Sequence, residues 1–279
     1  MKKTQEEVIK TTKKPITKDD IVLGLRKLGV KKDTKLEVHS KLSAFGYIVN
    51  REYDIIDALI EVIKDGVIIM PAHTSEHGDP AEWENPPVPK DWVPYILSHR
   101  RPFDPEIFVP QRVGKVPIAF ARYPGVVRTS HPVESYAVLN KTEDETWEDH
   151  SLDQDDEQHP LLKLAKEQGK ILFLGTDFQT CSSIHLTEKY AGKVRLVDQP
   201  AKIVVKGKIE DVRYRYYEFD DDIDYFEEIA KRYVAEYQGT ESYKQVKVGL
   251  ATCTLIDAEA LYDIAYEFFI EHKKSTSND

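Results

Sequence analysis

The stretch LEVHSKLSAFGYIVNREYDIIDALIEVIKDGVIIM (residues 36–70) predicts a strand, a helix and a second strand in succession. Residues 36–39 form a short strand pattern, residues 53–64 are apolar at helical spacing, and Gly66 leads into an unbroken apolar run at 67–70. Short buried strands joined by an amphipathic helix are typical of a parallel sheet covered by helices. We therefore expect an α/β fold with a central, largely parallel sheet.

The same alternation continues along the chain and predicts a single α/β domain over residues 1–279. Strands are predicted at 136–139, 170–174 and 246–256, helices at 17–28, 118–122, 161–167, 183–190, 225–237 and 258–272, and an antiparallel hairpin at 203–219. Thr17 and Asp20 have the spacing of a capping box. Eight of the fifteen prolines lie within residues 80–110, which indicates a long ordered loop. Residues 1–15 and 272–279 are expected to be flexible.

Composition narrows the class of function. A net charge of -10 argues against nucleic acid as a partner, and it suits either a cationic small molecule or simple solubility. No apolar run approaches the roughly 18 residues of a membrane helix, and the N-terminus lacks the apolar core of a signal peptide. Two cysteines give no disulfide framework or paired zinc motif. We expect a cytoplasmic protein that does not bind membranes, and its oligomeric state is unknown from the sequence.

Three polar segments follow predicted strands, namely residues 39–46, 71–79 and 175–188. Because the carboxyl ends of parallel strands meet at one edge of a sheet, ligands bind there. The backbone of the first segment suits a phosphate, or it forms a plain turn. In the third segment, His185 and Glu188 stand three residues apart on one face of the predicted helix. This spacing suits a general base with a carboxylate that orients it, or an ordinary ion pair on the surface.

Two further histidine patterns leave alternatives open. His131, in the sequence SHP, suits a catalytic role or a buried structural one. His73, His77 and Asp79 have ligand types that zinc accepts, so a metal-dependent hydrolase is an alternative hypothesis. The chain contains no Gly-x-Ser-x-Gly motif, which argues against an ordinary serine hydrolase.

Long motifs in this chain resemble the aminoglycoside 3-N-acetyltransferase family, also called the antibiotic N-acetyltransferase family. They are VHSKLSAFGYIV (38–49), IIMPAHTSEHGDPAEWENPPVP (68–89), FDPEIFVPQRVGKVPIAFARYPGVVRTSHPVESYAV (103–138) and GKILFLGTDFQTCSSIHLTE (169–188). The resemblance implies the fold of that family, which differs from the common acetyltransferase fold. It also implies transfer of the acetyl group of acetyl-CoA to the 3-amino group of a 2-deoxystreptamine-type aminoglycoside, an activity associated with antibiotic resistance.

The resemblance also implies roles for particular residues. His185, supported by Glu188, resembles the general base, and His131 is expected to line the same cleft. The residues expected at coenzyme A are Ser40, Lys41, Leu42, Ser43, Phe45, Gly46, Arg112, Val113, Gly114 and Ser130. Those expected at the acceptor are His73, Asp79, Glu82, Trp83 and Asn85. No metal is expected.

The chain departs from the family pattern at two places. Lys41 stands where the family commonly has a second serine, and it adds a charge suited to a coenzyme phosphate. Cys181 and Ser182 stand where Asn-Thr is common, which raises the alternative of a cysteine nucleophile carrying the acetyl group. A different amine acceptor with the same fold and coenzyme is a further alternative.

Overall fold

The computed structural model describes residues 5–84, 86–143, 145–148, 152, 159–192, 195–218 and 225–276. Its helices are α1 (Gln5–Thr11), α2 (Lys18–Leu28), α3 (Glu52–Val62), α4 (Val93–His99), α5 (Lys115–Phe120), α6 (Pro160–Lys166), α7 (Ser182–Tyr190), α8 (Tyr225–Tyr237) and α9 (Ala258–Thr276). Its strands are β1 (Lys35–Ser40), β2 (Val67–Pro71), β3 (Val127–Arg128), β4 (Tyr136–Asn140), β5 (Lys170–Leu174), β6 (Arg195–Val205), β7 (Lys208–Glu218), β8 (Tyr243–Val248) and β9 (Ala251–Asp257).

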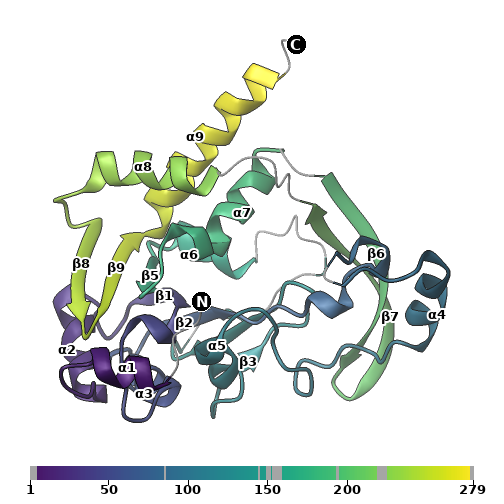
Figure 1. The fold of residues 1–279 in the computed structure, drawn as a ribbon. Helices are drawn as coiled ribbons and strands as arrows, with labels where there is room; N and C mark the ends of the chain where they lie inside the picture. The colour runs from purple at the N-terminus through teal and green to yellow at the C-terminus, as the bar shows by residue number, and fades with distance from the viewer. Residues whose placement is uncertain are drawn as a thin grey trace.

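The main sheet has the strand order β3-β4-β2-β1-β5-β9-β8. Strand β1 pairs in parallel with both β2 and β5, so these three central strands end at the same edge. The flanking pairs β2–β4, β3–β4, β5–β9 and β8–β9 are antiparallel. The separate hairpin β6–β7 lies on the opposite side of the molecule from β8 and β9 (Figure 1). The α/β class, the helical covering of the sheet and the separate hairpin agree with the prediction.

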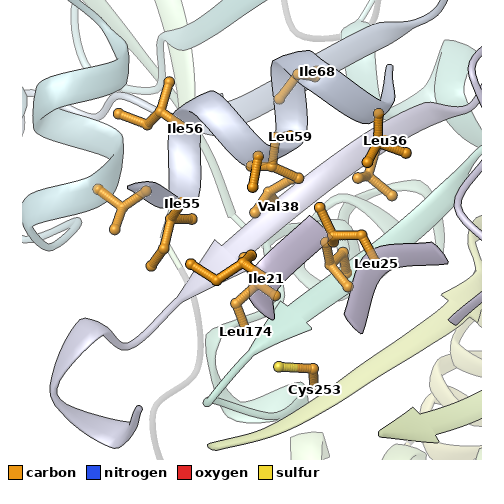
Figure 2. Close-up of a cluster of buried hydrophobic side chains, with 14 of the residues drawn as sticks. Ile21, Leu25, Leu36, Val38, Ile55, Ile56, Leu59, Ile68, Leu174 and Cys253 are labelled. Atoms are coloured by element: carbon orange, nitrogen blue, oxygen red, sulfur yellow. The ribbon is translucent and has the colours of Figure 1, made fainter. Parts of the chain in front are cut away.

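Successive residues of a strand point to opposite faces of the sheet, so both faces carry apolar side chains, and helices cover both. On one face, Ile21 and Leu25 of α2 and Ile55, Ile56 and Leu59 of α3 pack over the sheet, as Figure 2 shows. Helices α6, α7, α8 and α9 contribute to the core on the other face. Along β1, Leu36 and Val38 belong to the first core, so Glu37 and His39 point to the face that carries α7. Two polar side chains are thereby buried beneath α7.

Local signals set both ends of α2 as predicted. Thr17 and Asp20 form a complete capping box at the start of α2, and Gly29 ends that helix with φ 92°. Among the described residues, no helix combines the length and apolar character that crossing a bilayer requires.

Four segments differ in detail from the elements predicted for them. The strand expected at 246–256 is the hairpin β8–β9, because Gly249 turns the chain with φ 57°. The proline-rich loop at 80–110 contains α4, whose first turn accommodates a proline. Residues 5–11 of the expected flexible start form α1, and the tail is helical to Thr276.

Candidate active site

His185 lies on α7 at a pocket of about 360 Å³. The pocket is lined by His73, Ser75, Val133, Glu134, Tyr136, His159, Gln179, Thr180, Ser182, His185, Leu186 and Lys189. The His185 side chain is 41% exposed, and its Nδ1 lies 3.6 Å from Oε2 of Glu188, whose side chain is only 4% exposed. The Phe226 ring packs edge-on against the imidazole, with the centroids 4.8 Å apart. The imidazole therefore faces the pocket with a buried carboxylate behind it.

His73 follows β2 and faces the same pocket, so the structure brings the second and third polar segments together. Burial, together with smaller contributions from neighbouring imidazoles, His185 first, lowers the pKa of His73 to about 3. The ring stands edge-on to Tyr136, 5.6 Å between centroids, and its Nδ1 has no hydrogen-bond partner among the described residues. His73 is thus a neutral polar group beside His185 near pH 7.

Glu134 is a pocket residue that the sequence analysis did not single out. It is half-buried and lines this pocket. Burial raises the pKa of Glu134 to about 7, and the positive charge of Lys189 opposes that rise. The sequence signal that could have found it is its place in the SHPVES turn, immediately before β4.

His131 does not line the pocket, contrary to the sequence expectation. Its ring is completely buried; Nδ1 accepts the backbone N–H groups of Val133 (3.3 Å) and Glu134 (2.9 Å), and Nε2 lies 3.1 Å from the carbonyl oxygen of Arg215. Burial lowers the pKa of His131 to about 4. The neutral imidazole therefore fixes the turn, which is a structural role, and Ser130 lies half-buried beside it.

A buried polar network lies between β1 and the start of α7. Ser183 Oγ donates to Glu37 Oε2 at 2.5 Å, and His39 Nε2 lies 2.7 Å from Glu37 Oε1. Glu37 is completely buried, and His39 stacks on Phe173 with centroids 5.7 Å apart. Because Ser183 stands two residues before His185, this network ties the helix carrying His185 to the central strand.

Cys181 belongs to the same buried region, and its thiol does not fit the nucleophile alternative. Burial raises the pKa of Cys181 well above its usual value, and the negative charge of Glu37 raises it further. The residue has no exposed surface and does not line the pocket of His185. The thiolate that nucleophilic attack requires is therefore disfavoured here.

The structure does not bring His73, His77 and Asp79, the ligands of the metal-hydrolase alternative, together as a metal site within the described residues. His77 is buried between the rings of Phe103 and Phe108, with centroid distances of 5.3 and 4.5 Å, and burial lowers its pKa to about 4. Asp79 accepts from the Ala81 N–H at 2.9 Å. Within the described ranges, the group with ligand atoms near enough for a metal is Glu37, His39 and Cys181, all within 4.8 Å, and Glu37 there already holds two hydrogen bonds.

A larger pocket, of about 1280 Å³, adjoins the first, because Ser75 and Val133 line both. The predicted acceptor residues Asp79, Glu82 and Trp83 line this pocket, whereas Asn85 lies outside the described residues. Asp79 also accepts from Gln199 Nε2 at 3.0 Å, so both of its oxygens are engaged. The predicted acceptor residues are therefore divided between two pockets, with His73 in the smaller one.

The segment expected to bind coenzyme A lies at the edge where β1 and β5 end. Lys41 N–H donates to the carbonyl of Leu174 at 2.9 Å, and a Cβ on Gly114 would lie 3.8 Å from the Ser40 carbonyl oxygen, so two of the predicted segments meet. Lys41, Ser43 and Arg112 are exposed. Ser40 Oγ is buried with no hydrogen-bond partner among the described residues. An uncapped 3-10 turn follows at Leu42–Ala44.

Not every side chain of that segment can contact a ligand. Phe45 is completely buried in the core under α2 and α3, and Leu42 packs against the same core. The Phe45 side chain therefore lies in the core, and its carbonyl oxygen accepts from Leu250 N–H at 2.9 Å, while its assignment to the coenzyme stays a prediction. The exposed polar groups and the backbone are what this segment offers to a ligand.

Arg128 is a second residue that sequence reasoning missed. It is buried, and its guanidinium donates to the carbonyl oxygens of Ala72 and Phe108, to Thr74 Oγ1, and to Ser135 Oγ at 2.9 Å. Burial lowers the pKa of Arg128 to about 10. The planar fork of donors joins the segment after β2 to the proline-rich segment and to the turn before β4. Arg128 therefore holds the walls of both pockets together.

Comparison with known proteins gives consistent matches over nearly the whole chain. A family model described as aminoglycoside 3-N-acetyltransferase matches residues 38–270. The SPbeta prophage-derived aminoglycoside N(3')-acetyltransferase-like protein YokD of Bacillus subtilis (strain 168) is 32% identical, covering 96% of this chain and 97% of its own. Aminoglycoside N(3)-acetyltransferase IX of Micromonospora chalcea is 27% identical, covering 90% and 92%.

Solved structures agree with these matches. The crystal structure of YokD superposes with a TM-score of 0.85 at 31% identity, covering 96% of this chain and 98% of that chain. A structure described as AAC-IIIb binary with CoASH superposes with a TM-score of 0.79 at 24% identity, covering 93% and 98%. The second likeness extends the agreement in fold to a more distant protein.

Proposed function

Because the chain belongs to the aminoglycoside 3-N-acetyltransferase family, we propose that it transfers the acetyl group of acetyl-CoA to an amine of an aminoglycoside, with His185 as the general base. The substrate class and the coenzyme follow from the family. The role of His185 rests on one observation, which is that its imidazole faces a pocket while the buried Glu188 carboxylate lies behind Nδ1 at 3.6 Å. With Nδ1 directed toward Glu188, Nε2 is the nitrogen proposed to take the substrate proton.

Acetylation of an amine releases a proton, and the proposed acceptor of that proton is His185. The acceptor nitrogen attacks the thioester carbonyl carbon, a C–N bond forms, and the C–S bond breaks to release the coenzyme thiolate. His185 takes the proton that the nitrogen loses and returns a proton to the departing sulfur. Glu188 stabilises the imidazolium between these two transfers. The neutral imidazole of His73 adds no competing positive charge to the pocket near pH 7.

The donor is proposed to bind along the edge where β1 and β5 end. The exposed Lys41 and Arg112 carry the positive charge that coenzyme phosphates require, and Ser40 Oγ is a buried polar atom that a ligand could engage. The uncapped turn at Leu42–Ala44 adds backbone N–H groups. These observations fit a coenzyme held mainly through main-chain and polar contacts.

The acceptor is proposed to extend from the His185 pocket into the larger one. Glu82 and Asp79 line the larger pocket and provide negative charge for a polycationic sugar, and Trp83 provides a flat apolar wall. A different amine acceptor uses the same donor site and base, and we retain it as the competing hypothesis. Substrate profiling separates the two.

The test is thiol release from acetyl-CoA with a panel of 2-deoxystreptamine aminoglycosides. We expect turnover by the wild type and a loss of about 10²–10⁴-fold in kcat for His185→Gln, which keeps a side chain of similar size without a base. Glu188→Gln is expected to lower kcat while leaving the KM for acetyl-CoA unchanged. Equal rates for wild type and His185→Gln would remove His185 from the mechanism. Coenzyme binding without turnover of any aminoglycoside would favour a different amine.

A further inference from the structure

Glu134 lies in the same pocket as His185, and among the described residues no cationic side chain forms an ion pair with it. Within the described ranges, no hydrogen bond or ion pair reaches its side chain, although it is half-buried. A carboxylate withdrawn from bulk water without a partner is costly, and a cation that enters its pocket removes that cost. Its environment therefore favours a positively charged ligand group.

The surrounding charges leave this place to the ligand. Lys189, on α7, is the cation whose charge acts on Glu134, and it lines the same pocket without forming a direct ion pair with that carboxylate in the described contacts. His73 and His159 also face the pocket, and burial lowers the pKa of both well below neutrality. They carry no charge near pH 7, so neither imidazole supplies a counter-ion for Glu134.

The backbone holds Glu134 in a fixed position. Its N–H donates to Nδ1 of the buried His131 at 2.9 Å, and the other ring nitrogen of His131 is anchored on the carbonyl of Arg215. Strand β4 begins two residues later and pairs with β2, which leads to His73. Because the turn is anchored, little backbone freedom is lost when the Glu134 carboxylate binds a ligand group.

The acidic residues of the larger pocket differ from Glu134 in their contacts or in their location. Both carboxylate oxygens of Asp79 already accept hydrogen bonds, and Glu82 lines the larger pocket but not the one that contains His185. Val133, the neighbour of Glu134, lines both pockets. Glu134 is therefore the acidic side chain that shares the pocket of the proposed base in the described part of the chain.

We propose that Glu134 binds a second ammonium group of the acceptor and thereby selects amines that carry another positive charge close to the nitrogen being acetylated. This inference rests on the proposed function, because it assumes that an amine reacts at His185. A 1,3-diamine of the 2-deoxystreptamine type fits, since one nitrogen reacts while its neighbour stays protonated. His131 then acts as a positioning residue for Glu134.

The experiment compares Glu134→Gln with wild type, using sisomicin as the acceptor and acetyl-CoA as the donor. We expect the KM for sisomicin to rise about 10- to 100-fold at pH 8, as expected for the loss of a charged hydrogen bond, with the KM for acetyl-CoA unchanged. Glu210→Gln removes the same charge from an exposed position on β7 and serves as the control. Glu134→Asp, which keeps the charge on a shorter chain, should lie between wild type and Glu134→Gln.

An unchanged KM for sisomicin, or an equal rise in the KM values of both substrates, would overturn the role of Glu134. If the wild type acetylates no aminoglycoside, the proposed function fails separately. Calorimetric titration of sisomicin into wild type and Glu134→Gln then decides the inference. Binding weakened at least tenfold by the substitution supports a cation site, whereas equal affinity, or no binding to either protein, rejects it.

Discussion

Replacing Ser183 by alanine tests whether the buried network under α7 stabilises the fold and the site. Ser183 Oγ donates to Glu37 Oε2 at 2.5 Å, and the other oxygen of Glu37 contacts His39 Nε2 at 2.7 Å. Glu37 has no exposed surface, so water cannot replace the lost hydroxyl without a rearrangement. The substitution therefore leaves one oxygen of a buried carboxylate without its donor.

The expected cost follows from the charge and burial of that oxygen. A hydrogen bond to a charged group contributes about 1.5–3 kcal/mol, and a buried acceptor left without a donor loses most of this amount. For a chain of this length, a loss of about 2 kcal/mol lowers the Tm by roughly 4–8 °C. We expect Ser183→Ala to show this decrease in urea unfolding and in calorimetry. The reaction rate should fall as well, because Ser183 stands two residues before His185 on α7.

A double-mutant cycle provides the control. In a Glu37→Gln background the acceptor is a neutral amide, so Ser183→Ala should cost about 1 kcal/mol less than in the wild type. Ser98→Ala, at an exposed serine of α4, should change stability by less than about 0.5 kcal/mol. A cost of Ser183→Ala no larger than that of Ser98→Ala, or a cost that is the same in both backgrounds, would contradict a stabilising hydrogen bond between Ser183 and Glu37.

Three further outcomes follow from other parts of the structure. Gly175→Ala should destabilise the protein by more than about 1 kcal/mol in urea unfolding, because Gly175 has φ 72° and an added Cβ would lie 2.7 Å from the Ala44 Cβ. Gly207 has a similar φ of 75° but open space around it, so Gly207→Ala is the control that measures the backbone strain alone. Arg128→Met should cost about 3 kcal/mol or more, because it leaves several buried acceptors without donors, and an unchanged denaturation midpoint would contradict this. Glu134→Gln should stabilise the protein at pH 8 by up to about 3 kcal/mol and have little effect at pH 4. The reason is that a carboxyl pKa raised to about 7 in the folded wild type makes that protein lose stability as the pH rises from about 4.5 to 7. An equal gain in stability at both pH values would reject this assignment.

The sequence by itself determined the local elements and the family. The capping box at Thr17 and the helical spacing in residues 53–64 gave helices where they were predicted, because helix periodicity and capping depend on residues within a few positions of one another. The spacing of His185 and Glu188 likewise placed both on one helix. The family resemblance is confirmed by the match over residues 38–270, which extends beyond the quoted motifs. The coenzyme, acceptor and base assignments to individual residues stay predictions.

Only the tertiary structure decided which distant residues meet. Ser183 and Glu37 are 146 positions apart in the sequence, and their contact depends on how β1 and α7 pack. The sequence allowed a catalytic role for both His131 and His185, but their burial differs. His131 is enclosed and hydrogen-bonded, whereas His185 faces a pocket. The same packing turned Glu134 toward that pocket. Periodicity records which side of an element is apolar, whereas the sheet pairing and the burial of each polar group follow from contacts between segments that periodicity does not describe.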